Sequence, residues 1–195
     1  GRLAAAAAPA TVVGLVFSDV VGDDLDVIAS GPLVPDDSTY ADALDVVDRY
    51  DVMLPPRVER HLERGVDGEI PETPAPGADE FERVDTHILA NGLTALTAAA
   101  DAATDRGYAP LVLSSRVRGE AREAAKTHVG IAEEIRATGH PTAPPAVVLS
   151  GGETTVTLSD DAGAGGPNQE FALSAAIELS VDDVVVGSVD TDGID

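Results

Sequence analysis

The chain has 195 residues, with 35 acidic against 12 basic side chains, a formal net charge of -23 and no cysteine. So acidic a surface repels nucleic acid and anionic membranes, and the absence of cysteine excludes disulfide and thiolate chemistry. No apolar run approaches the roughly 20 residues of a membrane-spanning helix, and the alanine-rich start lacks the basic flank of a signal peptide. We therefore expect a cytoplasmic protein with neither nucleic acid nor membrane among its partners.

Two explanations of the acidic composition compete. Acidic chains with few aromatic residues are often disordered, and aromatic residues make up only 3% of this chain. Folded proteins adapted to molar salt are also acidic, because salt screens the repulsion between their carboxylates. A hydrophobic content of 44%, arranged with clear periodicity, favours the second explanation, a folded halophilic protein.

The first predicted elements are a strand and two helices. Residues 11–17 (TVVGLVF) form a nearly continuous apolar run, which is typical of a strand buried on both faces of a parallel sheet. Thr39, with Asp42 three residues later, predicts a helix that begins with a capping box. A second, short helix is expected over 55–65, where Gly65 occupies the place of a C-cap.

A surface loop and three further elements are predicted next. Residues 66–84 are rich in proline, glycine and acidic residues, which indicates a loop. A short strand is expected over 86–90 and a helix over 92–106, where apolar residues recur at helical spacing. A strand over 110–114 and a long helix over 119–138 continue the alternation.

The last part of the chain begins with a break in regular structure at the proline-rich run 141–145. Strands are predicted over 146–150 and 154–158, either as a tight hairpin or as two neighbouring strands. A helix follows, with apolar residues at helical spacing over 171–179, and a final strand is expected over 183–189.

Strands that alternate with helices predict an α/β fold. We expect a three-layer α/β/α domain with a mainly parallel sheet, followed by the beginning of a second α/β domain. The proline-rich run is the best boundary, so residues 1–143 are assigned to the first domain and residues 144–195 to the second. Because the chain stops within the acidic glycine loop 190–195, we also expect it to be a fragment that is inactive on its own.

Candidate functional residues follow the predicted strands, at the edge where ligands bind in open α/β sheets. Asp19 follows the first strand, the run Gly151-Gly152-Glu153 follows a later one, and Asp190 and Asp192 follow the last. Two aspartates in this position can hold Mg²⁺ through their oxygens or take a proton from an attacking hydroxyl group. The alternative is turn chemistry, because Asp-Gly is a favoured turn pair.

A glycine loop leads directly into the predicted helix that begins near Pro167. Backbone amides at such a helix start are natural ligands of phosphate, and Gly165 and Gly166 are the residues placed to offer them. Asn168 and Glu170, on the first turn, either orient a substrate or merely cap the helix. A flexible solvent loop remains the alternative for the glycines, since neither a P-loop nor a GxGxxG motif is present.

The histidines offer little chemistry. His128 lies on the apolar face of a long predicted helix and is interpreted as a satisfied core or cleft histidine. His61, His87 and His140 have no metal-ligand spacing, and no GxSxG elbow supports acyl transfer.

Several segments resemble a known family. Residues 18–32 (SDVVGDDLDVIASGP) and Gly119-Glu120-Ala121 are similar to the N-terminal domain of the glycerate 2-kinase family. Residues 150–156 (SGGETTV), 165–170 (GGPNQE) and 190–195 (DTDGID) resemble the C-terminal MOFRL domain of that family. The resemblance spans nearly the whole chain, and its first and third segments are long and specific.

The resemblance implies two α/β domains with a site in the cleft between them, and ATP-dependent phosphorylation of D-glycerate to 2-phosphoglycerate. ATP and Mg²⁺ are the expected cofactors, D-glycerate is the expected partner, and a homodimer is left open. Asp190 and Asp192 are assigned to catalysis and to the metal. The substrate-binding residues are Asp19, Asn168 and Glu170. The nucleotide-binding residues are Gly151, Gly152, Glu153, Gly165 and Gly166.

Two departures from the family pattern concern positive charge. The family's motif reads Gly-Gly-Arg-Asn-Gln-Glu, and its arginine position is Pro167 here. The other expected cation is a lysine upstream of Gly1, which Lys126 does not match. Two alternatives to the kinase are therefore kept: a non-catalytic relative that binds a nucleotide or small acid, and a hydroxypyruvate reductase, for which no nicotinamide fingerprint is found.

Overall fold

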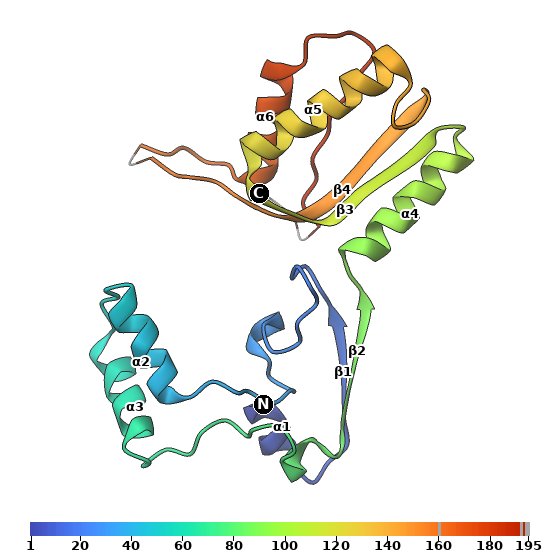
Figure 1. The fold of residues 1–195 in the computed structure, drawn as a ribbon. Helices are drawn as coiled ribbons and strands as arrows, with labels where there is room; N and C mark the ends of the chain where they lie inside the picture. Colours follow the sequence, from blue (N-terminus) through green and yellow to red (C-terminus); the bar gives the residue numbers. More distant parts are fainter. Residues whose placement is uncertain (160, 192, 194–195) are drawn as a thin grey trace. The chain divides into compact units, whose positions relative to one another are not determined.

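The computed structural model describes residues 1–159, 161–191 and 193. The chain divides into two compact units, each described here by itself (Figure 1). One unit comprises Gly1–Phe17 and Asp23–Leu89, and the other comprises Ser18–Gly22 and Ala90–Asp195. None of the helices in the described ranges combines the length and apolar character needed to cross a membrane. The predicted domain boundary at residue 143 is a different division and stays a prediction.

Strands β1 (Val12–Phe17) and β2 (Val84–Ala90) form a two-stranded sheet. Backbone hydrogen bonds of 2.9 Å join the amide of Val12 to the carbonyl of Arg83 and the amide of Ser18 to the carbonyl of Ala90. From the first bond to the second, the residue numbers increase on both strands, so the pairing is parallel.

The strand predicted over 11–17 is confirmed, but its predicted burial on both faces is wrong for this chain. Val13, Leu15 and Phe17 are 60%, 62% and 73% exposed, whereas Gly14 between them is buried. Since successive side chains of a strand point to opposite faces, one face of β1 is covered and the other is open.

The helices of the first unit are α1 (Arg2–Ala7), α2 (Tyr40–Arg49) and α3 (Pro56–Val66), with short 3-10 turns at Ile28–Ser30 and Asp79–Phe81. The predicted capping box of α2 is confirmed: the Thr39 side chain accepts from the Asp42 amide, and the Asp42 carboxylate accepts from the Thr39 amide. Helices α2 and α3 pack against each other.

The predicted C-cap role of Gly65 is wrong. Gly65 is buried inside the last turn of α3, and the helix ends one residue later. A Cβ atom at this position would lie 2.1 Å from Cγ of Tyr40, so glycine is needed for close packing of the two helices.

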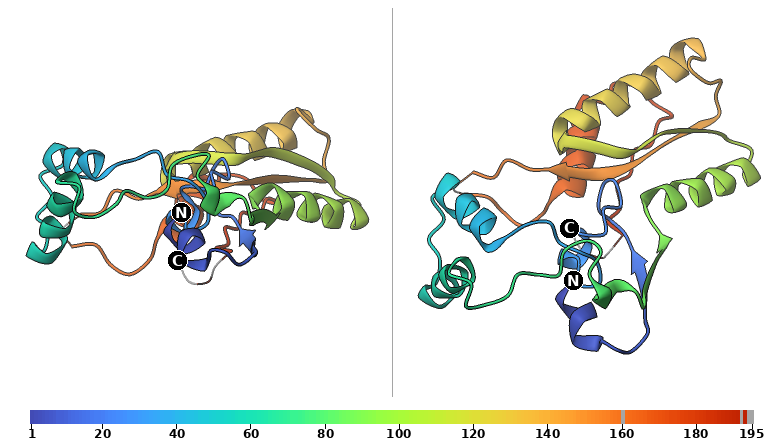
Figure 2. Two further views of the ribbon diagram at one scale, coloured as in Figure 1. Left: turned by 90° about the horizontal axis from the view of Figure 1, so that it is seen from below. Right: turned by 60° about the horizontal axis from the view of Figure 1, so that its bottom comes forward.

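The second unit is built on strands β3 (Ala109–Glu120) and β4 (Ala146–Thr155), which run parallel and side by side (Figure 1, Figure 2). Helix α4 (Gly92–Asp105) packs on one face, and α5 (Ala121–Thr138) packs on the other, where α6 (Pro167–Glu178) lies against it. The predicted α/β class with parallel strands is therefore confirmed, and this unit has the three expected layers.

Strand β4 replaces the two strands predicted over 146–150 and 154–158. It runs through both glycines without a hairpin and stays paired with β3 as far as Glu120 and Thr155. At Gly152 (φ 153°) a Cβ atom would lie 2.1 Å from the Val117 carbonyl oxygen. The glycine thus permits the close approach of β4 to β3, beside a register shift between Ser114 and Val117.

The prediction of a strand over 183–189 is wrong, because none of these residues belongs to a strand. Val185 and Val189 are 95% and 85% exposed. Val186 instead packs against the small core between α5 and α6, which contains Val129 and Ala175. The alternation of apolar residues therefore reflects packing on helices and not pairing in a sheet.

Candidate functional site

A cavity of about 610 Å³ lies in the second unit, where β3 and β4 end beside residues 18–22. Its volume is within the range of small-molecule binding sites. Two carboxylates, one guanidinium group and one hydroxyl group stand among apolar and glycine residues. The lining residues are Asp19, Val20, Val21, Arg118, Gly119, Glu153 and Thr155.

The parallel pairing of the strands brings the polar side chains together. Arg118 is the register partner of Glu153, and Glu120 is the register partner of Thr155. Gly119 (φ 91°) has nothing within 4 Å of an added Cβ atom. Glycine is therefore favoured here by the positive φ at the end of β3, and not by close packing.

Glu120 borders this region and is held as a carboxylate. The Thr157 hydroxyl group donates to Glu120 Oε1 at 2.7 Å, and the Thr157 amide donates to Oε2 at 3.3 Å. These bonds, the hydroxyl bond first and with a smaller contribution from Arg122, hold the pKa of Glu120 below its ordinary value. Arg122 Nη2 lies 3.7 Å from Glu120 Oε2.

The start of α6 holds four of the predicted site residues. Gly166 is the N-cap and Pro167 occupies the first turn, as predicted, while Gly165 (φ 134°) precedes them. Asn168 Oδ1 accepts a hydrogen bond from the Ser188 hydroxyl group. This bond fastens the segment that leads to Asp190 to the first turn of α6.

Glu170 has a structural contact. Its Oε1 atom is buried, accepts no hydrogen bond from a described residue, and lies 3.9 Å from Nε of Arg122. Arg122 is also tied to α6 through its carbonyl oxygen, which accepts from the Ser174 hydroxyl group at 2.9 Å. Glu170 therefore joins α6 to α5, and its predicted substrate role stays a prediction.

His128 is a satisfied histidine, as predicted. Its Nδ1 atom lies 2.7 Å from the Ala124 carbonyl oxygen, which can only accept, so Nδ1 carries the proton. Nε2 then accepts from the Ser150 hydroxyl group, also at 2.7 Å. The ring packs edge-on against Phe171 with centroids 5.2 Å apart.

The structure brings some of the predicted site residues together and not others. Asp19 and Glu153 line the same cavity, and Gly151 and Gly152 belong to the strand that leads to it. The residues at the start of α6 and Asp190 do not line this cavity. Asp192 lies outside the described residues. Within the described ranges no three His, Cys, Asp or Glu side chains are grouped as metal ligands, and the predicted site roles stay predictions.

Sequence reasoning missed Arg118 and Thr155. The family pattern places its cations at the position of Pro167 and upstream of Gly1, and neither position is at the end of β3. The signal was present: Arg118 directly precedes the Gly119-Glu120-Ala121 segment at which a strand passes into a helix. The strand-end rule that selected Asp19 applies equally to Arg118.

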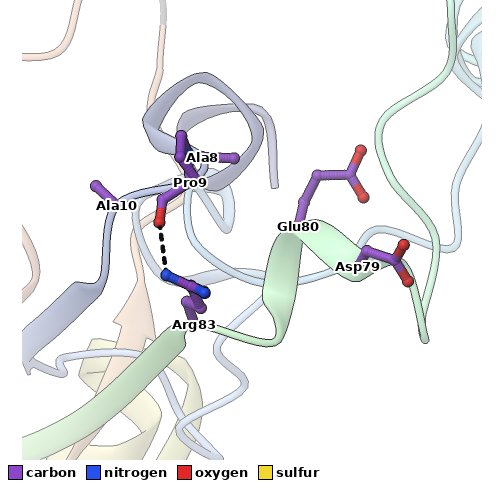
Figure 3. A pocket seen from close by; sticks show the side chains of 6 residues that line it. All are labelled: Ala8, Pro9, Ala10, Asp79, Glu80 and Arg83. Carbon is purple, nitrogen blue, oxygen red and sulfur yellow. Dashed lines mark hydrogen bonds between the residues drawn. The ribbon is translucent and has the colours of Figure 1, made fainter.

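A second cavity, of about 330 Å³, lies in the first unit and is lined by Ala8, Pro9, Ala10, Asp79, Glu80 and Arg83 (Figure 3). The Arg83 guanidinium group donates to the Pro9 carbonyl oxygen at 3.2 Å. Figure 3 shows the Asp79 and Glu80 carboxylates directed away from this arginine. Because its arginine already holds a backbone carbonyl, we interpret this cavity as structural.

Family models match both ends of the chain. Residues 1–63 match a model described as a domain of unknown function (DUF4147), and residues 146–195 match the MOFRL family. The glycerate 2-kinase of Pyrococcus horikoshii is 39% identical over 187 residues, covering 95% of this chain and 42% of that protein. An Agrobacterium vitis protein, provisionally named a hydroxypyruvate reductase, is 45% identical over 197 residues, covering 100% of this chain and 43% of that protein.

A solved structure agrees with the sequence relatives. The crystal structure of glycerate kinase from Thermotoga maritima matches with a TM-score of 0.74 and 37% identity, covering 93% of this chain and 41% of that one. The chain thus spans less than half the length of these relatives. The two family models agree with the motifs at 18–32 and 150–156. So do the sequence similarity, which extends over nearly all of this chain, and the shared fold. The chain belongs to the glycerate 2-kinase family.

Proposed function

We propose that the protein containing these residues phosphorylates D-glycerate to 2-phosphoglycerate with ATP as the donor. The observation that carries the proposal is the match, over 93% of this chain, to the fold and sequence of a glycerate kinase. The cavity at the ends of β3 and β4 supports it, because ligands of open α/β sheets bind at this edge.

The proposed cofactors are ATP and Mg²⁺. Carboxylate oxygens are the donors that Mg²⁺ prefers, usually one or two of them together with phosphate oxygens. Asp190 and Asp192 are the proposed holders of the metal, with Glu153 beside the nucleotide. When bound, the ion would neutralise charge on the phosphates.

Backbone amides are the proposed ligands of the phosphate groups. Gly151 and Gly152 lie in β4, and Gly165 and Gly166 precede α6, whose N-terminus favours an anion. With little covalent chemistry for the protein to perform, catalysis would rest on positioning and electrostatics.

The acceptor side is proposed to lie around Asp19. A carboxylate there can accept the hydrogen bond of a substrate hydroxyl group and orient it for attack. Asn168 and Glu170 are kept as further positioning residues. We also propose a cytoplasmic, halophilic protein, in line with the net charge of -23.

A coupled assay for ADP release tests the kinase. The complete natural protein, in molar salt with ATP, Mg²⁺ and D-glycerate, is expected to release ADP only when D-glycerate is present. ADP release that does not depend on the acid, or none at all, would contradict the proposal.

Hydroxypyruvate reduction is the second candidate, favoured by the name of the 45% identical relative. Against it, the sequence has no GxGxxG fingerprint for a nicotinamide cofactor. Loss of NADH absorbance on addition of hydroxypyruvate would decide for the reductase. Binding of ATP or glycerate with neither activity would instead indicate a non-catalytic relative.

A further inference from the structure

Arg118 contributes the positive charge of the cavity in the second unit. Its guanidinium group has no hydrogen bond or ion pair with any other described residue. Two cations of α5 are engaged: Arg122 lies within 4 Å of two glutamates, and Lys126 Nζ lies 2.9 Å from Glu123 Oε1. The cavity therefore contains a guanidinium group whose donors no other described residue occupies.

The chemistry of the lining matches a small hydroxy acid. A guanidinium group offers paired donors that fit the two oxygens of a carboxylate. Asp19 offers acceptors for a hydroxyl group, and the Thr155 hydroxyl group can donate or accept. A carboxylate with a hydroxyl group next to it is what a hydroxy acid presents to such a lining.

The backbone holds Arg118 in place. It lies on β3 and is paired in register with Glu153 of β4, next to the close approach at Gly152. Side chains carried by paired strands are positioned more firmly than those of loops. The guanidinium group is thus presented to the cavity from a firm element, whereas Asp19 comes from the loop after β1.

We propose that Arg118 is a substrate-binding residue that holds the carboxylate of the phosphoryl acceptor, while Asp19 accepts a hydrogen bond from the acceptor's hydroxyl group. This assignment rests on the proposed function for the identity of the acid. It predicts where the acid binds and which residue recognises its charge.

The experiment compares Arg118→Ala, Arg118→Lys and Arg116→Ala in the complete natural protein. Arg116 is the matched control, because it lies on the same strand and does not line the cavity. Arg118→Ala is expected to raise the KM for D-glycerate at least about tenfold and leave the KM for ATP within about twofold. Arg118→Lys should recover part of the loss, and Arg116→Ala should change neither constant by more than about twofold.

Two outcomes would overturn the assignment. One is that Arg118→Ala and Arg116→Ala have the same KM for D-glycerate, and the other is that Arg118→Ala raises the KM for ATP and not the KM for D-glycerate. Calorimetric titration of the same proteins with D-glycerate and with inorganic phosphate separates this assignment from the kinase proposal. Glycerate binding that depends on Arg118, in a protein without kinase activity, would retain the assignment and reject the kinase. Wild-type protein that binds no glycerate, or binds phosphate alone through Arg118, would reject the assignment.

Discussion

Gly152 is the residue on which the close approach of β3 and β4 depends. Its φ of 153° lies in a region that side chains disfavour, and an added Cβ atom would lie 2.1 Å from the Val117 carbonyl oxygen. Gly152→Ala is therefore expected to lower the free energy of unfolding by about 1–3 kcal/mol. Urea unfolding in molar salt, followed by circular dichroism, measures the change.

Gly163→Ala is the matched control for this change. Nothing lies within 4 Å of a Cβ atom built at Gly163, and its backbone carries no positive φ. Its unfolding free energy should stay within about 0.5 kcal/mol of wild type. Equal destabilisation by the two substitutions would show that the close approach to Val117 is not what makes glycine necessary at position 152.

Substitution of Pro167 tests whether an arginine at this position contributes to phosphoryl transfer. Pro167→Arg places a guanidinium group on the first turn of α6, where it can stabilise charge on a transferring phosphoryl group. We expect kcat of the complete natural protein to rise about tenfold or more, with Pro167→Gln as the uncharged control. An arginine variant with unchanged kcat would count against a phosphate contact at this position.

The positions of single residues could be predicted where a general rule applied to them, while their roles at a site stay predictions. The strand-end rule selected Asp19 and Glu153, which line one cavity, and helical spacing identified His128 as satisfied. Gly65 was not recognised, because its role depends on Tyr40, which lies opposite in space but 25 positions away in the sequence, and no local pattern encodes that contact. Arg118 was overlooked although the strand-end rule applies to it.

At the scale of elements, the segment after β4 is fastened to the start of α5 by Thr157 and Glu120. Because hydrogen bonds from Thr157 lower the folded-state pKa of Glu120, they add stability at pH values above the ordinary value of 4.5, and this stability is lost as the pH falls through the folded pKa. Thr157→Val should raise the pKa of Glu120. The free energy of unfolding should then depend less steeply on pH below about pH 4.5.

Carbon-detected NMR of the Glu120 carboxylate follows that titration directly. Thr104→Val is a suitable control, because the Thr104 hydroxyl group donates to the Ala100 carbonyl oxygen and not to a carboxylate. If the pKa of Glu120 were the same in wild type and Thr157→Val, the hydrogen bond would not be its cause.

Elements were predicted from periodicity with different success. Helices were found because capping residues and apolar spacing are local signals, as at Thr39 and Gly139, the left-handed residue that ends α5. Strands were less certain, since pairing depends on a distant partner. The glycines that suggested a hairpin lie inside β4, and the alternation at 183–189 reflects packing against α5 and α6.

At the scale of the molecule, the net charge of -23 sets the expected response to salt. Self-repulsion of the folded chain grows as the Debye length increases from about 3 Å in molar salt to about 30 Å in 0.01 M salt. We expect the 195-residue chain to lose its helical circular dichroism signal on dialysis to millimolar salt. A signal that stays unchanged over this range would refute adaptation to high salt.

The central claim is that the protein transfers a phosphoryl group to D-glycerate. Phosphorus NMR of the complete natural protein with ATP, Mg²⁺ and D-glycerate tests it most directly, because the spectrum identifies both products. The account predicts equal amounts of ADP and 2-phosphoglycerate, and none of the latter when D-glycerate is omitted. ADP accompanied only by inorganic phosphate, or unchanged ATP beside active reduction of hydroxypyruvate by NADH, would contradict it.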